Sequence, residues 1–355
     1  MPNVFHDELD CVLADTRDLW KELREQRIFI TGGTGFFGCW LLETFLWAND
    51  QLGLKARVTV LTRNSRAFEQ KAPHLAKHPA VTLLDGEVRS FHFPEGHFSH
   101  VIHAATQSSA ALNREQPEVM FDTTLEGTRR CLEFAVACGA RKFLLTSSGA
   151  VYGTQPPQLT HLPETFSGGP DPLDPNSAYA EGKRAAEMLC MLAARDSALQ
   201  TKIARGFAFV GPYMVFDAHF AIGNFIREQL HGGPIRVQGD GTPYRSYMYA
   251  TDLMTWLWTI LFRGTSGRAY NVGSEKAVSI RELAHAVAGA FSPRVKVEIL
   301  GTPTPGAPVQ RYVPSTARAR QELGLTPQVS LQQAIQRTQG WFQQTQMATT
   351  QEANQ

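Results

Sequence analysis

The sequence lacks an excess of charge of one sign and lacks any long apolar run. Lys and Arg together number 34 and Asp and Glu 33, for a formal net charge of +1, which disfavours a protein that depends on contacts with phosphate backbones. No stretch reaches the roughly 18 apolar residues of a transmembrane helix. Residues 1–26 are polar and carry no signal-peptide pattern. We therefore expect a cytoplasmic protein that binds neither nucleic acid nor membrane.

Cysteine and histidine are present without the spacing that would give them a structural role. The 5 cysteines form no C-x-x-C pair, and an odd number in so long a chain argues against a disulfide framework. The 11 histidines include no H-E-x-x-H and no Cys/His cluster with zinc spacing. We expect reduced, buried thiols and no metal site.

What is present is the composition and rhythm of an α/β protein. Hydrophobic residues make up 43% and charged residues 19% of the 355-residue chain, which supplies a globular core. Short apolar runs alternate with helical patterns, and such βαβ units predict a doubly wound parallel sheet of the Rossmann type. The expected strands are 27–31, 57–61, 81–84, 100–103, 142–146 and 202–205.

Beyond about residue 207 glycine and proline become more frequent, which indicates a smaller C-terminal lobe for the substrate. We expect an N-terminal helical extension over 1–25 and a dinucleotide-binding domain over 26–206, with 246–263 packing back on it. The substrate-binding lobe would comprise 207–245 and 264–342. The Gln/Thr-rich tail, 343–355, is expected to be disordered.

A glycine-rich turn follows the first expected strand and precedes a helical pattern. In Thr31-Gly32-Gly33-Thr34-Gly35-Phe36-Phe37-Gly38 two registers fit, G-x-x-G-x-x-G from Gly32 and G-x-G-x-x-G from Gly33. Glycines allow a tight turn, close approach of the backbone to a pyrophosphate and close packing of helix on strand. The N-terminus of the helix adds free N–H groups. The pattern predicts a dinucleotide site.

The end of the second strand leaves the cofactor open between NAD and NADP. A carboxylate there would bind the ribose hydroxyls of NAD, but the chain has Leu61-Thr62-Arg63-Asn64-Ser65-Arg66. Arg63 and Arg66 could meet a 2′-phosphate. After the third strand, Asp85-Gly86-Glu87-Val88 is expected to pass the adenine.

Candidate catalytic groups lie on a helix and after the fifth strand. Tyr179 and Lys183 form Y-x-x-x-K, and four residues are about one helical turn, so they share a face. A phenol has a pKa near ~10, and a nearby ammonium favours the phenolate. The tyrosine could then take a proton from a substrate hydroxyl. Ser148 is expected at the carboxyl edge of the sheet, close to the same oxygen.

Together these motifs resemble the extended short-chain dehydrogenase/reductases, and more narrowly the nucleotide-sugar epimerase/dehydratase group, over residues 25–342. The resemblance includes His103-Ala104-Ala105, Gly127-Thr128 and Gly239-Asp240-Gly241 with Arg245. It implies a nucleoside-diphosphate sugar as substrate, and a homodimer through the helices at 117–138 and 177–194.

The resemblance also assigns the site residues. Catalysis falls to Ser148 and Tyr179, with Lys183 on the nicotinamide ribose. Substrate contacts are expected from Ser148, Asn224, Arg245 and Arg311, with His219 facing the sugar. The expected cofactor contacts are Gly32, Gly35, Phe36, Phe37, Gly38, Thr62, Arg63, Glu87, Val88, Ala104, Ala105, Tyr179 and Lys183.

Two departures from the family pattern bear on the reaction. Gly149 and Ala150 stand where the dehydratases usually have Asp and Glu, and where the decarboxylases usually have Glu at the second position. The sequence therefore favours an epimerase that acts through a 4-keto intermediate. A 4-ketoreductase remains an alternative, as does a dehydratase or decarboxylase in which His219, Glu164 or Glu181 replaces the missing acid. A non-catalytic dinucleotide sensor is the least favoured reading.

Overall fold

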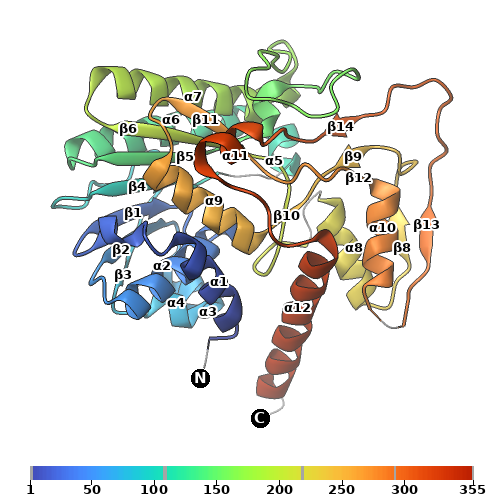
Figure 1. The fold of residues 1–355 in the computed structure, drawn as a ribbon, viewed down its shortest axis with the longest axis horizontal. Coiled ribbons are helices and arrows are strands. Elements are labelled where there is room, and N and C mark those ends of the chain that lie inside the picture. Colours follow the sequence, from blue (N-terminus) through green and yellow to red (C-terminus); the bar gives the residue numbers. More distant parts are fainter. Residues whose placement is uncertain (1–2, 107–109, 217–219, 292, 354–355) are drawn as a thin grey trace.

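The computed structural model describes residues 3–106, 110–216, 220–291 and 293–353 and is built on a seven-stranded parallel sheet (Figure 1). The strand order is β11-β6-β5-β4-β1-β2-β3. The doubly wound prediction is confirmed. Most of these strands are almost continuously apolar because helices cover both faces of the sheet. Their bounds are β1 Arg27–Thr31, β2 Arg57–Thr62, β3 Val81–Asp85, β4 His100–His103, β5 Lys142–Ser148, β6 Gln200–Gly206 and β11 Arg268–Val272.

Two hydrophobic cores lie on opposite faces of this sheet. Alternate residues of a strand point to opposite faces, so Phe29 belongs to one core and its neighbours Ile28 and Ile30 to the other. The core around Phe29 is closed by α6 (Pro117–Ala137) and α7 (Ala178–Asp196). The opposite core is closed by α2 (Phe36–Leu52) and α9 (Ala250–Arg263). Both helical layers position residues at the carboxyl ends of the strands.

The N-terminal extension is helical and packs on the second core. It comprises α1 (His6–Thr16) and the 3₁₀ turn η1 (Trp20–Leu23). Helix α1 contacts α2 and α9. The fully buried Trp20 lies against Trp258 of α9, with ring centroids 4.7 Å apart. The N-terminal extension is therefore part of the hydrophobic core on this face of the sheet.

The seventh strand differs from the sequence expectation, which gave 264–342 to the substrate lobe. The structure adds β11 to the edge of the main sheet, parallel to β6. Helix α9 crosses the face of the sheet and returns the chain parallel to β6, as a βαβ crossover does. The buried Tyr270 and Val272 complete the core there. The pairing of β11 with the distant strand β6 decides this placement, and the five residues of β11 do not by themselves indicate their partner.

The smaller lobe has a core of its own, around Phe225, Ile235, Leu283 and Ile335. Figure 1 places its α8, α10, β8 and β13 together, away from β1–β3. The lobe elements are α8 Ala221–Leu230, β8 Ile235–Val237, β9 Tyr244–Arg245, β12 Val278–Ser279, α10 Ile280–Gly289, β13 Val297–Ile299, β14 Arg311–Tyr312 and the start of α12. The remaining elements are α3 Ser65–Lys71, α4 Pro73–Ala76, α5 Ala110–Glu115, η2 Gly149–Tyr152, η3 Pro175–Ser177, β7 Phe209–Val210, β10 Met248–Tyr249 and α11 Ala317–Leu323.

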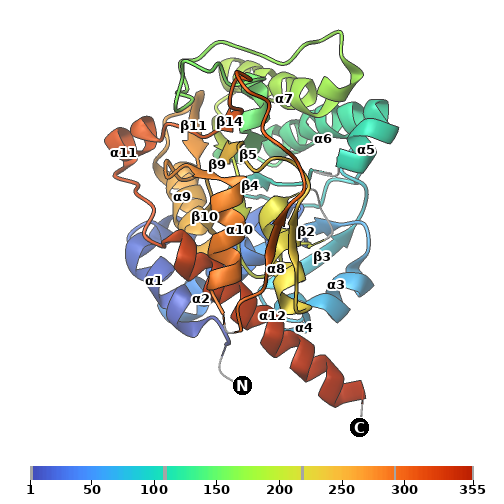
Figure 2. The ribbon, with the colours of Figure 1, turned by 90° about the vertical axis from the view of Figure 1, so that its right-hand side faces the viewer.

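The C-terminal segment also differs from expectation. Helix α12 runs from Leu331 to Ala353, so the disorder expected from residue 343 is wrong up to residue 353. The segment contains no proline, and its Gln, Ala and Met residues are good helix formers. Figure 2 shows α12 extending away from the sheet towards the C-terminus.

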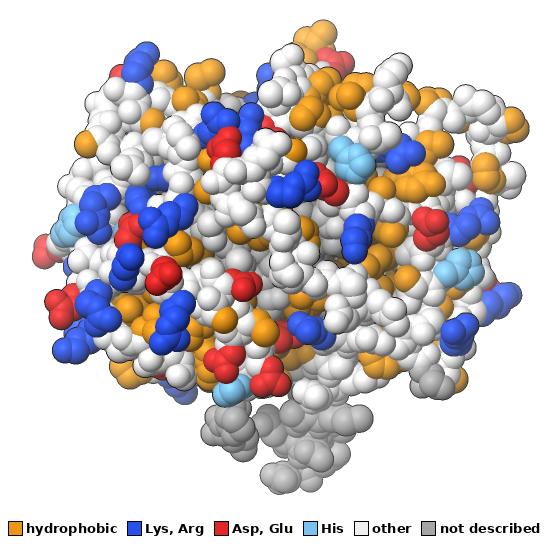
Figure 3. Space-filling model, viewed as in Figure 1, with side chains coloured by type: hydrophobic (Ala, Val, Ile, Leu, Met, Phe, Trp, Pro, Cys, Tyr) orange, Lys and Arg blue, Asp and Glu red, His pale blue; other side chains and the backbone are white. Residues whose placement is uncertain are grey.

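The outer surface carries charges of both signs. On the face drawn in Figure 3, basic and acidic side chains are interspersed rather than gathered by sign. Within the part of the chain that the structure describes, no helix has the length and apolarity needed to cross a membrane.

Candidate active site

A cavity of about 770 Å³ opens at the carboxyl ends of the parallel strands, where open α/β sheets bind their ligands. Its lining comes from the ends of six strands and from the lobe. The residues at the strand ends are Thr31, Gly32, Leu61, Thr62, Arg63, Gly86, Glu87, Val88, Ala104, Ala105, Thr106, Thr146, Ser147, Ser148, Gly206 and Phe207, and the lobe side adds Met214, Val215, Phe220 and Tyr312.

In the glycine turn, the backbone of Gly32 and Gly35 lines the cavity without intervening side chains. Gly32 has φ +71°, and a Cβ there would lie 2.6 Å from the backbone of Ala104. A Cβ on Gly38 would lie 2.2 Å from the Gly32 carbonyl oxygen, so this glycine lets α2 pack on the turn. Gly35 lines the cavity and caps α2. Gly33 is also closely packed, because a Cβ there would lie 2.5 Å from the Val60 side chain. Gly32 and Gly35 are the glycines of this turn that line the cavity, and their exposed backbone fits a dinucleotide pyrophosphate.

The adenosine candidates gather at the other end of the same cavity. Thr62, Arg63, Glu87 and Val88 all line it. The Asp85 carboxylate accepts hydrogen bonds of 2.9 Å from both the backbone N–H and the hydroxyl of Ser65, which ties the loop after β2 to β3. Arg63 is exposed and so free to turn towards a ligand.

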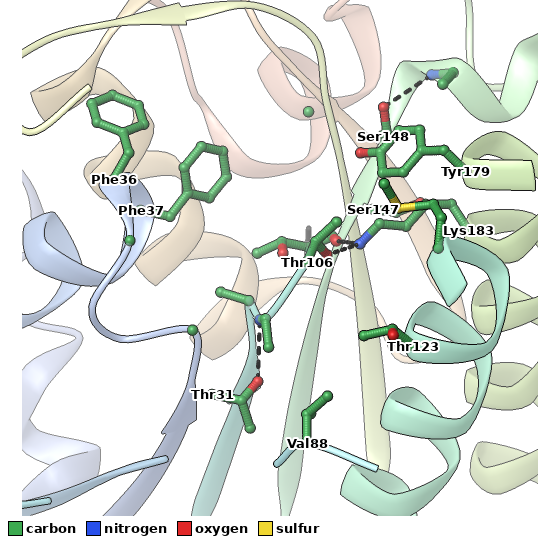
Figure 4. A pocket seen from close by; sticks show the side chains of 18 of the residues that line it. Thr31, Phe36, Phe37, Val88, Thr106, Thr123, Ser147, Ser148, Tyr179 and Lys183 are labelled. Carbon is green, nitrogen blue, oxygen red and sulfur yellow. Dashed lines mark hydrogen bonds between the residues drawn. The ribbon is translucent and has the colours of Figure 1, made fainter. Parts of the chain in front are cut away.

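The three predicted catalytic residues meet on one wall of the cavity (Figure 4). Phe36 and Phe37 lie across from them. Ser148 ends β5, and its hydroxyl accepts a 3.1 Å hydrogen bond from the Ala150 N–H. Tyr179 and Lys183 project from the first turns of α7. That helix start is held by the 2.9 Å hydrogen bond from the Tyr179 N–H to Asn113 Oδ1.

Lys183 is buried, and its ammonium group makes two hydrogen bonds within the chain. Its Nζ donates to Thr106 Oγ1 at 2.6 Å and to the Thr146 carbonyl at 2.7 Å. Burial lowers the pKa of Lys183 to about 8, while Glu187 and then Cys190 act to raise it. An ammonium has three donors, so one N–H is left for a ligand in the cavity.

The electrostatics of Tyr179 correct one expectation. Burial raises the pKa of Tyr179, and the nearby Ser148 acts in the opposite direction. Because burial is the larger effect, the phenol pKa in the chain alone is raised and not lowered as expected. An oxidised nicotinamide, which is cationic, would favour the phenolate.

A second phenol reaches the same serine, and the sequence did not single it out. Tyr312 of β14 lines the cavity together with Ser148. Burial raises the pKa of Tyr312, and the nearby Ser148 acts in the opposite direction. A Cβ on Gly149 would lie 2.7 Å from the Tyr312 hydroxyl and 2.7 Å from Phe207. Tyr312 thus occupies the space that a side chain at position 149 would need. Strand β14 has only two residues, which is too short for an alternating pattern of apolar and polar residues. The sequence therefore gave no signal for Tyr312.

The acids considered as replacements for the missing carboxylate lie elsewhere. Glu164 accepts a 2.9 Å hydrogen bond from the Asn271 N–H, and Glu181 pairs with Arg184 at 3.4 Å. Neither lines the cavity, where Glu87, at the adenosine end, is the one carboxylate among the described residues. His219 lies outside the described residues. In the described part of the chain, no group of three His, Cys, Asp or Glu residues is placed to hold a metal.

The diphosphate candidates stand next to the cavity without lining it. Arg245 and Arg311 lie on the paired strands β9 and β14, where Tyr312 is in register with Arg245. The Arg311 guanidinium covers the ring of Tyr244, 4.4 Å from its centroid, and Arg245 donates to the Tyr244 carbonyl at 2.8 Å. Asn224 lies on α8. The structure thus brings both arginines to one pair of strands. There they contact Tyr244 and do not line the cavity.

Comparisons with known proteins agree with this construction. UDP-glucuronic acid decarboxylase 3 of Arabidopsis thaliana is 31% identical over 309 residues, covering 87% of this chain and 86% of the relative. The UDP-glucose 4-epimerase of Thermotoga maritima superposes with a TM-score of 0.73 at 22% identity, covering 90% of this chain and 99% of that one. The dTDP-glucose 4,6-dehydratase of Streptomyces venezuelae, solved with NAD, gives a TM-score of 0.72 at 25% identity, covering 90% and 97%.

The family model matches residues 28–273, from the first strand of the sheet to the end of the last. This segment carries the glycine turn, Ser148, Tyr179 and Lys183. The glycine turn, the parallel sheet and the matched span together show that the chain belongs to the NAD dependent epimerase/dehydratase family.

Proposed function

We propose that the protein oxidises a nucleoside-diphosphate sugar at a secondary hydroxyl and acts further on the resulting ketone. One observation supports this most: a single cavity joins the glycine turn to Ser148, Tyr179 and Lys183. A bound nicotinamide dinucleotide would supply hydride acceptance. Tyr179 takes the hydroxyl proton and Ser148 hydrogen-bonds the same oxygen. The free N–H of Lys183 holds the nicotinamide ribose.

The further step that fits best is decarboxylation of a nucleoside-diphosphate hexuronic acid. The curated relatives are named UDP-glucuronic acid decarboxylases. Oxidation at C4 of such a sugar places a ketone β to the carboxylate, and CO₂ can leave as electrons move onto the ketone oxygen. The carbon that carried the carboxylate then takes a proton from water, and the ketone is reduced again at C4. The loss of CO₂ itself requires no protein carboxylate, so it can proceed with Ala150 at the position where the decarboxylases usually have Glu. The hydroxyls of Ser148 and Tyr179 are placed to stabilise the developing oxyanion.

Epimerisation at C4 is the second candidate. It requires only that the ketone be reduced on its other face, so it too needs no acid at positions 149 and 150. The sequence Ser148-Gly149-Ala150-Val151-Tyr152 supports it, because it resembles that of the epimerases and lacks the Glu that decarboxylases usually have at the position of Ala150.

One assay separates these candidates. The purified protein is incubated with UDP-glucuronic acid and, separately, with UDP-glucose, and the products are separated by chromatography and identified by mass spectrometry and NMR. We expect UDP-glucuronic acid to lose the mass of CO₂. A UDP-hexose isomer of unchanged mass would favour the epimerase instead. Turnover of neither substrate, with or without added NAD or NADP, would contradict both.

The same protein sample identifies the cofactor. The family is NAD-dependent, while Arg63 at the end of β2 offers a cation to a 2′-phosphate. Either reaction above returns the hydride to the sugar, so we expect the dinucleotide to stay bound through purification. Acid release followed by mass spectrometry then gives NAD or NADP directly.

We also propose a homodimer through α6 and α7, which lie side by side (Figures 1 and 2). Both helices expose apolar side chains, Val136 on α6 and Met188 and Met191 on α7. Replacing both methionines by glutamate places charge in this face and should convert the dimer to a monomer in sedimentation velocity. The control is Leu300→Glu, an exposed apolar position in the lobe. A monomeric wild-type protein would overturn the proposal.

A further inference from the structure

A buried carboxylate lies directly behind Ser147, which lines the cavity. The proposed chemistry gives this carboxylate no role. Glu187 follows Lys183 by one turn of α7 and is 8% exposed. Its Oε1 accepts hydrogen bonds from Ser147 Oγ at 2.6 Å and from Arg205 Nε at 2.9 Å. Its Oε2 accepts a 2.6 Å hydrogen bond from Arg205 Nη2. Ser147 and Arg205 are in register on β5 and β6, so this carboxylate joins three elements.

The network continues from Arg205 to the loop after Ser148. Arg205 Nη1 donates to the Tyr152 hydroxyl at 2.9 Å, and the guanidinium lies 4.8 Å from the centroid of the Tyr152 ring. The Tyr152 hydroxyl donates in turn to Asn271 Oδ1 at 2.7 Å. A buried ion pair held by this many hydrogen bonds has one geometry. Ser147, two residues before η2 begins, and Tyr152, at the end of η2, are thus both linked to Glu187.

Glu187 and Lys183 are four residues apart on α7 and are both buried, so they share the inner face of that helix. Arg205 pairs with the carboxylate, and the titratable groups His103 and Cys190 near Lys183 are neutral. His103 on β4 is neutral, because burial and then Lys183 lower its pKa to about 3. Burial raises the pKa of the Cys190 thiol, so it too is neutral. Glu187 is therefore the carboxylate that opposes the effect of burial on Lys183.

We propose that Glu187 is a positioning residue that keeps Lys183 charged and, through Ser147 and Arg205, fixes Ser148 at the end of β5. It acts through these neighbours and does not itself line the cavity. The inference rests on the proposed hydride-transfer function, in which the ammonium of Lys183 and the hydroxyl of Ser148 are both used.

The test compares the pH dependence of kcat in the wild type and in Glu187→Gln. Activity that needs the ammonium is lost as the pH rises through the pKa of Lys183, which is about 8. Removing the carboxylate lowers that pKa further, so we expect the alkaline limb of the variant to move down by about 1 pH unit or more. Glu187→Asp keeps the charge but holds it farther from Lys183, so its alkaline limb should lie between those of the wild type and Glu187→Gln. Asp196→Asn, at the exposed end of α7, is the control and should leave the profile unchanged.

A second measurement separates this inference from the proposed function. The side-chain Cε signal of Lys183, in ¹³C-labelled protein and assigned with Lys183→Arg, titrates without any turnover. A lower midpoint in Glu187→Gln than in the wild type supports the inference even if no sugar nucleotide is converted. Equal midpoints in Glu187→Gln and the wild type would overturn the inference. If Glu187→Gln does not fold, a downward shift in Glu187→Asp, whose shorter side chain draws the charge away, decides the question.

Discussion

Replacing Tyr179 by phenylalanine is expected to lower kcat by about 100- to 10,000-fold, the usual contribution of a positioned acid–base group. The variant keeps the ring that packs at the start of α7 and loses only the hydroxyl. That hydroxyl lies in the same cavity as Ser148 and belongs to the group proposed to take the substrate proton. The dinucleotide affinity and the thermal unfolding midpoint should stay close to those of the wild type, because Lys183 keeps Thr106 and Thr146 as partners.

The matched control is Tyr312→Phe, since both phenols reach Ser148. Tyr312 approaches from β14 and has no lysine one turn away, so we expect a loss of less than about tenfold. Steady-state kinetics on whichever sugar nucleotide is turned over, with fluorescence titration of the dinucleotide, measures both effects. If Tyr312→Phe were inactive and Tyr179→Phe nearly normal, the roles would be reversed. Near-normal turnover in both Tyr179→Phe and Tyr312→Phe would show that neither phenol takes the substrate proton.

The second large effect is expected at the glycine turn, from a pair of alanine substitutions. A Cβ on Gly35 would meet only the Gly32 carbonyl oxygen, at 3.5 Å, and the residue lines the cavity. Gly35→Ala should therefore fold, with its unfolding midpoint lowered by a few degrees at most. Its methyl group would occupy the space of the pyrophosphate, so the dinucleotide affinity should fall at least about tenfold.

Gly38→Ala should behave differently. Its Cβ would lie 2.2 Å from the Gly32 carbonyl oxygen and 2.3 Å from Gly33, so α2 has to move away from the turn. Such overpacking costs about 1–3 kcal/mol or more, and both stability and dinucleotide affinity should be lost. Thermal unfolding combined with dinucleotide titration distinguishes the two variants. Wild-type affinity in Gly35→Ala would show that the dinucleotide does not lie on this turn.

The sequence by itself determined the features that depend on short-range patterns. The parallel sheet follows from apolar runs alternating with helices, and the glycine turn follows from three glycines between a strand and a helix. Tyr179 and Lys183 were recognised as neighbours because four residues make about one turn. The position of Ser148 followed from the rule that carboxyl ends of parallel strands share an edge. Each of these depends on residues fewer than about ten apart or on a general property of sheets.

Only the tertiary structure decided the contacts between distant segments. It moved β11 from the lobe to the edge of the main sheet and brought Tyr312 to Ser148, 164 positions earlier in the chain. It also gave Lys183 its partners Thr106 and Thr146, and Glu187 its partner Arg205. The pKa values of Tyr179 and Lys183 belong to the same class, because burial is their largest cause. Burial is set by packing of the whole chain, and no local pattern of residues encodes it.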